Sequence, residues 1–287
     1  MDGRRGSAAW ATAWCGYWQG ESMTPDIIPF QFGDDDSPLF GCHHRPPAES
    51  TSRSSAVIIC APIGQEYLRS HRALRLLAAR LAQAGFHVLR FDYFGCGDSA
   101  GDDQHGRLDE WVRNVRSAVD VIRRRTRVEN VCLVGLRLGA ALALLAAAEQ
   151  PDVKSLVLWD PVWRGGEFVR ELTTAQHEKL QELTNRELVD GRQQGFLGFD
   201  LSKTLLAEVE QLDLSGPDCL PACPVLMLSS ARRKQSDSRD STDQSGCAEM
   251  TLCRIDEDAN WLTGPMRTVM PHSAIRTAVS WITKSCP

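Results

Sequence analysis

The short motif with the clearest chemical meaning is Gly135-Leu136-Arg137-Leu138-Gly139. An apolar run precedes it at residues 131–134 and an alanine-rich run follows it at residues 140–148, so the pattern predicts a strand, a tight turn and a helix. In a nucleophile elbow, the spacing G-x-S-x-G presents a serine hydroxyl at such a turn. Here arginine holds the serine position. Its guanidinium stays protonated at physiological pH and has no usable lone pair, so Arg137 cannot attack a carbonyl carbon.

The two partners of an elbow nucleophile are also missing by position. A carboxylate is expected after the strand at residues 224–228, but that strand leads into cations at residues 232–234, and aspartates return only from residue 237 onward. A histidine is expected after the strand at residues 249–255, where the chain has Asn260. We therefore expect that the nucleophile, the acid and the base are all absent from their usual places.

Two other side chains are candidate nucleophiles. Ser99 lies in Gly-Asp-Ser-Ala-Gly, which also matches G-x-S-x-G, although several polar residues separate it from the next helix, whereas an elbow needs a helix at once. Cys96 is the better nucleophile by chemistry if its pKa is lowered. His105, in the same loop, or His272 would then act as base. The enzyme alternative is hydrolysis of an ester, thioester or amide through Ser99 or Cys96.

Arg137 needs a negative partner wherever it is buried. A cation at a helix N-terminus opposes the helix dipole by ~0.3–1 kcal/mol, and an unpaired buried charge costs considerably more. An internal salt bridge is the simpler account, with Asp160 as the favoured partner and Asp98 or Glu66 as the others. In the alternative account, Arg137 and the helix N-terminus together receive a carboxylate or phosphate of a ligand.

A second turn completes the candidate pocket. It contains Gly64, Gln65 and Glu66 and follows a buried strand at residues 56–60, where an oxyanion-hole loop would lie. Amide donors at this turn can persist without a nucleophile. We therefore expect the elbow and this turn to bind a small acyl or anionic ligand, or a partner protein.

The elements that position these residues follow an α/β rhythm. An opening hairpin is expected at residues 28–42, and buried strands at 56–60, 86–91, 131–134 and 155–159 alternate with amphipathic helices. This alternation predicts a mostly parallel sheet with helices on both faces. Residues 163–218 break the rhythm with two helical segments, which we interpret as a small helical cap between the core parts 23–162 and 219–287.

Composition excludes several classes of function. With 287 residues, 43% hydrophobic and 24% charged, the chain has the make-up of a globular protein, and a net charge of −5 gives no reason to expect nucleic acid. No apolar run reaches the ~20 residues of a membrane helix. Residues 1–22 lack a secretory core and are interpreted as a disordered arm or an early start, which favours a cytoplasmic location with the ten cysteines as thiols.

No cofactor and no metal are expected. The one metal alternative pairs Cys219 and Cys223 with His43 and His44, but the C-x3-C spacing here does not form a zinc knuckle and no second cysteine pair follows.

Several stretches resemble a known family. They are residues 32–41, 62–67, 89–93, 95–101, 135–140 and 158–162. These stretches are similar to bacterial α/β-hydrolase-fold proteins of the serine aminopeptidase type, and the nearest group is the exosortase-A-system-associated hydrolases, some of which share Gly-Leu-Arg-Leu-Gly-Ala at the elbow. The resemblance implies the α/β-hydrolase fold and the description hydrolase. It carries over no catalytic residue, because Arg137, Arg233 and Asn260 stand where the wider family has its triad.

Overall fold

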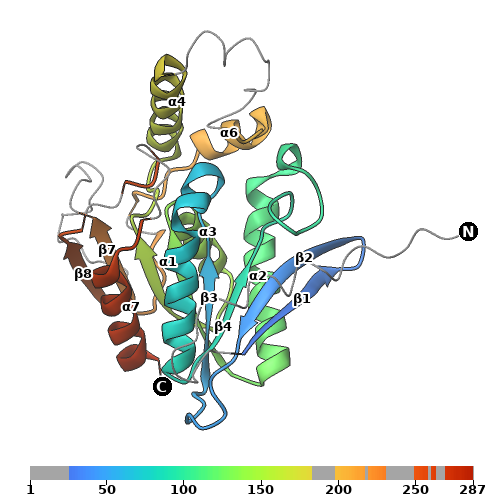
Figure 1. Cartoon of the computed structure of the whole chain (residues 1–287), viewed down its shortest axis with the longest axis vertical. Helices are drawn as coiled ribbons and strands as arrows, with labels where there is room; N and C mark the ends of the chain where they lie inside the picture. The colour runs from blue at the N-terminus through green and yellow to red at the C-terminus, as the bar shows by residue number, and fades with distance from the viewer. Residues whose placement is uncertain are drawn as a thin grey trace, which may run out of the picture.

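The computed structural model describes residues 26–182, 198–216, 219–230, 249–257, 260–262 and 269–286 (Figure 1). The expected arm at residues 1–22, Arg233 and the aspartates from residue 237 to 243 lie outside the described residues.

Within these residues, one sheet of eight strands has the order β1-β2-β4-β3-β5-β6-β7-β8. The strand bounds are β1 Ile27–Asp34, β2 Ser37–His44, β3 Ser55–Cys60, β4 His87–Phe91, β5 Asn130–Leu136, β6 Val153–Trp159, β7 Val225–Ser230 and β8 Met250–Ile255. β2 pairs antiparallel with both β1 and β4, and every other pairing is parallel. This arrangement confirms the predicted hairpin and the mostly parallel sheet.

Helices cover both faces of the sheet, as predicted. Their bounds are α1 Gly64–Gln83, α2 Leu108–Thr126, α3 Leu138–Ala148 and α7 His272–Ser285, with a 3-10 turn at Asp103–His105. α1 and α7 pack on one face and α2 and α3 on the other, so two hydrophobic cores sandwich the sheet (Figure 1). β3 and β5 have buried side chains facing both cores, which explains why they appear in the sequence as continuous apolar runs.

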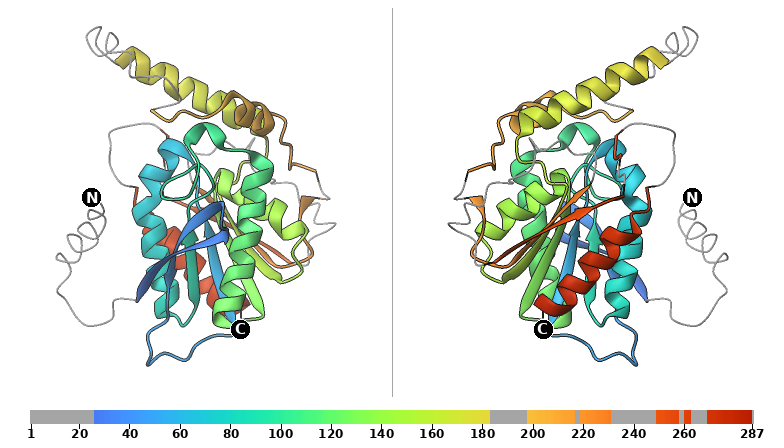
Figure 2. Two further views of the ribbon diagram at one scale, coloured as in Figure 1. Left: turned by 90° about the vertical axis from the view of Figure 1, so that its right-hand side faces the viewer. Right: turned by 90° about the vertical axis from the view of Figure 1, so that its left-hand side faces the viewer.

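In the described part of the segment after β6, the helices are α4 Gly165–Glu182 and α6 Lys203–Glu210. Both lie beyond the carboxyl-terminal ends of the parallel strands, with α4 crossing above them (Figure 2). The chain enters and leaves this segment side by side, since Gly165 N donates to Leu212 O at 2.7 Å and Leu214 N donates to Trp163 O at 2.7 Å. The division of the chain into a core and a cap stays a prediction.

Some boundaries differ from expectation. The turn expected to include Gly64, Gln65 and Glu66 is shorter, because α1 already begins at Gly64. β7 continues through Ser229 and Ser230, where a loop was expected, because both residues pair with β8. Among the described residues, no helix has the length and hydropathy needed to cross a bilayer.

Candidate functional site

The elbow is formed by the sharp passage from β5 to α3. Arg137 alone separates the two elements, and it has φ 56° and ψ −121°, a conformation that residues with a side chain rarely adopt. The flanking glycines are required by contact distances. A Cβ at Gly135 would lie 2.3 Å from Ala140 Cα, and one at Gly139 would lie 2.2 Å from Cys60 O. The Gly-x-Arg-x-Gly spacing therefore builds a genuine elbow that carries a cation.

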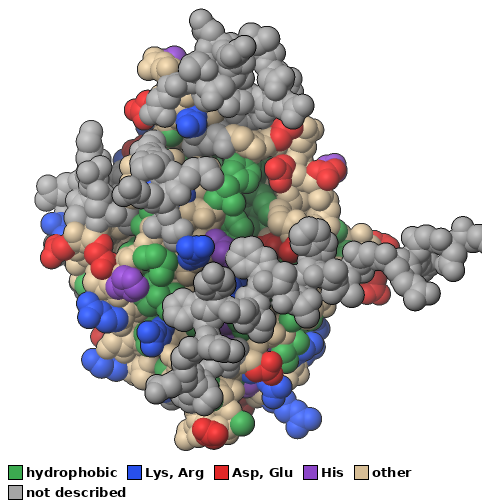
Figure 3. All heavy atoms as spheres, in the orientation of Figure 1, with side chains coloured by type: hydrophobic (Ala, Val, Ile, Leu, Met, Phe, Trp, Pro, Cys, Tyr) green, Lys and Arg blue, Asp and Glu red, His purple; other side chains and the backbone are tan. Residues whose placement is uncertain are grey.

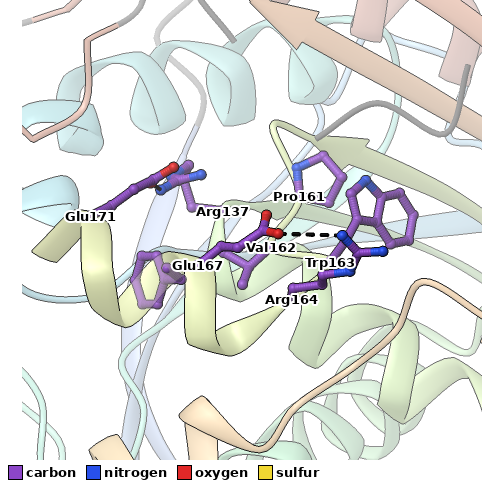
Figure 4. Close-up of a pocket in the computed structure, with 8 residues that line it drawn as sticks. Arg137, Pro161, Val162, Trp163, Arg164, Glu167 and Glu171 are labelled. Atoms are coloured by element: carbon purple, nitrogen blue, oxygen red, sulfur yellow. Dashed lines mark hydrogen bonds and ion pairs between the residues drawn. The ribbon is translucent and has the colours of Figure 1, made fainter. Parts of the chain in front are cut away.

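The guanidinium of Arg137 is bound by two carboxylates. Its Nε donates to Glu66 Oε1 at 2.6 Å and its Nη2 donates to Glu171 Oε2 at 2.5 Å. Arg137 is 2% exposed and Glu66 is fully buried, whereas the Glu171 side chain is 36% exposed. Figure 4 shows Glu171 on α4 meeting the arginine head group. Arg137 thus joins the elbow to the first turn of α1 and to α4.

Electrostatics favour the charged form of Arg137. Burial alone would lower its pKa, but the charges of Glu66 and Glu171 outweigh burial and hold the pKa above its ordinary value. The guanidinium carbon also lies 5.3 Å from the centre of the Phe168 ring on α4. Two carboxylates and an aromatic face therefore surround the cation, so its charge is already compensated within the protein.

Asp160, the favoured partner in the sequence interpretation, has another role, and that expectation is corrected. Its Oδ1 accepts from Ser230 N at 2.8 Å, and its Oδ2 accepts from Ser230 Oγ at 2.6 Å and from Trp261 Nε1 at 2.9 Å. The backbone oxygen of Asp160 accepts from Arg137 Nη1 at 3.5 Å, and the charge of its carboxylate adds to the raised pKa of Arg137 after Glu66 and Glu171. The carboxylate turns toward the ends of β7 and the 260–262 segment because three donors meet it there.

The position expected for a histidine holds no imidazole. Asn260 accepts from Arg69 Nε through its backbone oxygen and from Leu262 N through its side chain. The next residue, Trp261, is 4% exposed and supplies the indole N–H that reaches Asp160. A carboxylate and a ring N–H therefore meet here, as in an acid–histidine pair, but an indole is a donor only and cannot accept a proton.

The surroundings of Ser99 and Cys96 do not activate either side chain as a nucleophile. Ser99 Oγ donates to Asp92 O at 2.6 Å and accepts from Phe40 N at 2.8 Å, which ties its loop to β2 and β4. The pKa of Cys96 is raised to about 12 by burial and by the nearby carboxylates Asp103 and Asp92. A thiol in this state is a poor nucleophile at neutral pH.

The histidines proposed as bases make other contacts. His105 is exposed, and its Nδ1 accepts from Asp102 N at 3.1 Å within the 3-10 turn. His272 is exposed at the start of α7. No hydrogen bond among the described residues joins either histidine to Ser99 or Cys96. The structure therefore does not assemble the alternative dyads.

The remaining predicted residues lie around the elbow or nearby. Gly64 has φ 55° and opens α1, and Gln65 is half-buried in the first turn of that helix. Asp98 is exposed, and its backbone N donates to Asp92 Oδ2 at 3.1 Å, so the suggestion that Asp98 pairs with Arg137 is wrong. Glu66 was one of the suggested partners and is confirmed. Glu171 was missed, since nothing in the pattern of α4 distinguishes it from the other acids of that helix.

The metal alternative is not supported where the structure describes the chain. His43 Nε2 lies 3.0 Å from His87 Nδ1, and His44 accepts from Arg90 Nε at 3.1 Å. No group of three or more His, Cys, Asp or Glu side chains suited to a metal occurs among the described residues.

Two cavities lie at this end of the molecule. The smaller, of about 230 Å³ with its open mouth included, is bounded by Arg137, Trp163, Phe168 and Glu171 (Figure 4). The larger, of about 550 Å³ measured in the same way, lies beside the 61–64 turn and is mostly apolar. Figure 3 shows a hollow lined by hydrophobic side chains in the upper half of the face it presents. The larger cavity was not expected from the sequence, because its walls come from four separate segments.

Solved structures of esterases share this fold. The chain is similar to the esterase Est1E from Butyrivibrio proteoclasticus with ferulic acid bound, at 18% identity and a TM-score of 0.63, covering 89% of this chain and 96% of that one. It is also similar to the Pyrococcus furiosus esterase Pf2001, at 14% identity and a TM-score of 0.66, covering 95% and 96%. A third similar structure is XC6422 from Xanthomonas campestris, described as a serine hydrolase without a lid, at 15% identity and a TM-score of 0.57, covering 91% and 96%. At these identities the likeness shows the α/β-hydrolase fold.

Among curated proteins, a subunit of poly(3-hydroxyalkanoate) polymerase, PhaC, from Haloferax mediterranei is 26% identical over 111 residues, which is 38% of this chain. The chain spans only 22% of that relative's length. Residues 54–268 match the family described as serine aminopeptidase, S33. This match includes the elbow, the 61–64 turn and the strands that hold them, and the chain therefore belongs to the serine aminopeptidase S33 family.

Proposed function

We propose that this protein is a non-catalytic member of its family that binds a small molecule without consuming it. The observation that carries the proposal is Arg137 at the elbow, with its guanidinium held by Glu66 and Glu171. A hydrolase of this fold needs a nucleophile at that bend and a histidine to activate it. Neither requirement is met by the described residues around the elbow.

The bound molecule is better described as apolar than as anionic. Two carboxylates already neutralise Arg137, so an anion at the elbow would displace one of them or meet its charge. The sequence interpretation left open an acyl ligand, an anionic ligand or a partner protein. The ion pairs and the mostly apolar cavity beside the 61–64 turn favour a ligand with an acyl or other apolar body.

The alternative function is hydrolysis of an ester, thioester or amide through Ser99 or Cys96. Against it stand the two backbone hydrogen bonds of the Ser99 hydroxyl and the raised pKa of the Cys96 thiol. This alternative and the non-catalytic proposal predict different outcomes with the same substrates.

The test measures hydrolysis of short p-nitrophenyl esters and thioesters, together with labelling by a fluorophosphonate probe. We expect the wild-type rate to equal that of buffer with an equal amount of albumin, and no adduct in the intact mass. Arg137→Ser should remain inactive, because no imidazole is positioned to activate the new hydroxyl. Turnover that Ser99→Ala or Cys96→Ala abolishes, while Arg137→Ala retains it, would overturn the proposal.

We propose that residues 163–218 act as a cap, that the chain falls in the exosortase-A-associated group, and that it is a bacterial cytoplasmic protein. Contacts between α6 and the core support the cap, since Glu208 accepts from Arg107 Nε at 2.7 Å and from Leu108 N at 2.9 Å.

A further inference from the structure

The larger cavity is separate from the cation at the elbow. Its lining comes from residues 61–64 and Tyr67 in the first turn of α1, the end of β4 with the loop that follows it, the start of α2, and residues Phe199 and Leu201. Arg137 is not part of this lining, and Gly64 is the one residue that the cavity shares with the pocket expected from the sequence. The cavity can therefore take a ligand of a different kind from the one that an elbow arginine would attract.

The walls of this cavity are rich in aromatic rings. The aromatic lining residues are Tyr67, Phe91, Tyr93, Trp111 and Phe199. Three of these rings are held by hydrogen bonds from their polar ends: Tyr93 Oη donates to Ala61 O at 3.1 Å, Trp111 Nε1 donates to Phe94 O at 2.9 Å, and Tyr67 Oη donates to Asp92 Oδ1 at 3.1 Å. Rigid rings of this kind offer flat apolar surface and negative ring faces, which suit an apolar body and a cation.

The charged groups of the lining are all acidic. Asp92 and Asp103 contribute carboxylates, and no arginine, lysine or histidine is among the described lining residues. Arg90 acts on Asp92 from the sheet, but its Nε donates to His44. The Asp92 carboxylate accepts from Tyr67 Oη and Asp98 N, both at 3.1 Å, so it is held in place. An anionic ligand would meet repulsion here, whereas a cation would be attracted.

The burial of Asp92 also favours a cationic ligand. Burial raises the pKa of Asp92, which means that its carboxylate is poorly solvated as an anion. A ligand cation beside it would return part of the stabilisation that water provides elsewhere. The half-buried Cys96 thiol in the same lining is protonated at neutral pH and adds no charge.

We propose that this cavity binds a small ammonium compound with an aromatic or short aliphatic body, placing its amine at Asp92 and its body among the aromatic rings. This inference names the class of ligand for the proposed function. It rests on that proposal in one respect: the ligand is bound and released without being chemically changed. The amine and the rings would be recognised together, as in other sites where carboxylates and aromatic faces surround a cation.

The test is calorimetric titration of the full chain with three compounds that share one body: 3-phenylpropylamine, 3-phenylpropanol and 3-phenylpropanoate. We expect the amine to bind about tenfold tighter than the carboxylate, which corresponds to about 1.4 kcal/mol, with the alcohol between them. None of the three has a bond that a hydrolase cleaves. A failure here therefore leaves the non-catalytic proposal intact, and turnover of esters leaves this result intact.

Three variants test whether the compounds bind in this cavity. Asp92→Asn should bring the amine to within about twofold of the alcohol, while alcohol binding persists. Leu201→Trp should weaken the amine and the alcohol together, because it fills the cavity. Leu68→Trp is the matched control, since Leu68 is 54% exposed on α1 and outside the lining. Circular dichroism establishes that each variant is folded.

A measurement on the unmodified protein gives a second criterion. Affinity for the amine should fall as salt is raised from 20 to 300 mM, whereas affinity for the alcohol should stay constant. The proposal is wrong if the carboxylate binds as tightly as the amine or if no compound binds. It is equally wrong if the amine keeps its preference in Asp92→Asn.

Discussion

Replacing Arg137 by methionine measures how much the arginine contributes to the stability of the fold. Methionine keeps a long unbranched stem but removes the charge and all five N–H donors. The fully buried Glu66 would lose the cation that now lies 2.6 Å away. Removing one partner of a buried ion pair typically costs about 3–5 kcal/mol, because the other charge stays in a poorly solvating site. The contact with Glu171 adds at most ~1 kcal/mol, since that side chain is 36% exposed.

Urea unfolding followed by circular dichroism measures this loss. We expect Arg137→Met to lower the free energy of unfolding by about 3–5 kcal/mol. The double variant Arg137→Met with Glu66→Gln should recover about half of the loss or more, because it removes the buried negative charge as well. Arg113→Met is the matched control. Arg113 bridges Asp109 and Glu110 on the exposed side of α2, and its loss should cost less than ~1 kcal/mol.

Two outcomes would refute this reasoning. One is a loss below ~1 kcal/mol in Arg137→Met, which would mean that the ion pair with Glu66 contributes little. The other is additive destabilisation in the double variant, which would mean that the two side chains act independently. Either result would reopen the account in which Arg137 serves an external anion.

Three further predictions concern the surroundings of the elbow. Glu171→Gln should speed amide hydrogen exchange in α4 while exchange in α2 stays unchanged, because the link from the elbow to α4 is weakened. Gly139→Ala should destabilise the protein by about 1–3 kcal/mol or more in urea unfolding, because the added Cβ would lie 2.2 Å from Cys60 O. Gly166→Ala is the control: its added Cβ would lie 3.5 Å from Glu210 O, so this change should be neutral or stabilising. The pKa of His44 is lowered to about 3, first by burial and then by Arg90. Between about pH 6.5 and pH 3 the unfolded chain therefore binds a proton that the folded chain does not. The free energy of unfolding consequently falls as the pH drops from about 6.5 toward 3 and is unaffected by His44 above about pH 6.5. His44→Gln should flatten the dependence of unfolding free energy on pH between 6.5 and 4, by about 2 kcal/mol at pH 5.

The sheet and the elbow were predictable because local signals specify them. β3 is buried at every position and appears in the sequence as a continuous apolar run, and the two glycines around Arg137 are required by backbone contacts that any residue with a Cβ would block. Such signals lie within a few residues of the feature they predict. The alternation of strands and helices predicted a mostly parallel sheet but not the strand order, which depends on the pairing of strands distant in sequence.

The partners of Arg137 were only partly predictable because they depend on tertiary placement. Glu66 lies next to the elbow, since β3 and β5 are neighbours in the sheet and α1 begins just beyond β3. Glu171 reaches Arg137 only because α4 crosses above the elbow, and that crossing depends on how residues 163–165 run beside 212–214. For Asp160 the position was right but the direction of the side chain was not, since Ser230 and Trp261 supply better donors.

The bend at Arg137 has the backbone geometry of a nucleophile elbow although it carries a cation. A positive φ at a residue with a side chain costs of order 1–3 kcal/mol and persists only where the surroundings enforce it. Here the close packing at Gly135 and Gly139 enforces the bend, and Arg137 N donates to Trp159 O at 2.9 Å. The side chain projected from that bend must lie where a nucleophile would stand. A charged residue there is tolerated because Glu66 on α1 and Glu171 on α4 both pair with it, so the bend joins α1, the elbow and α4.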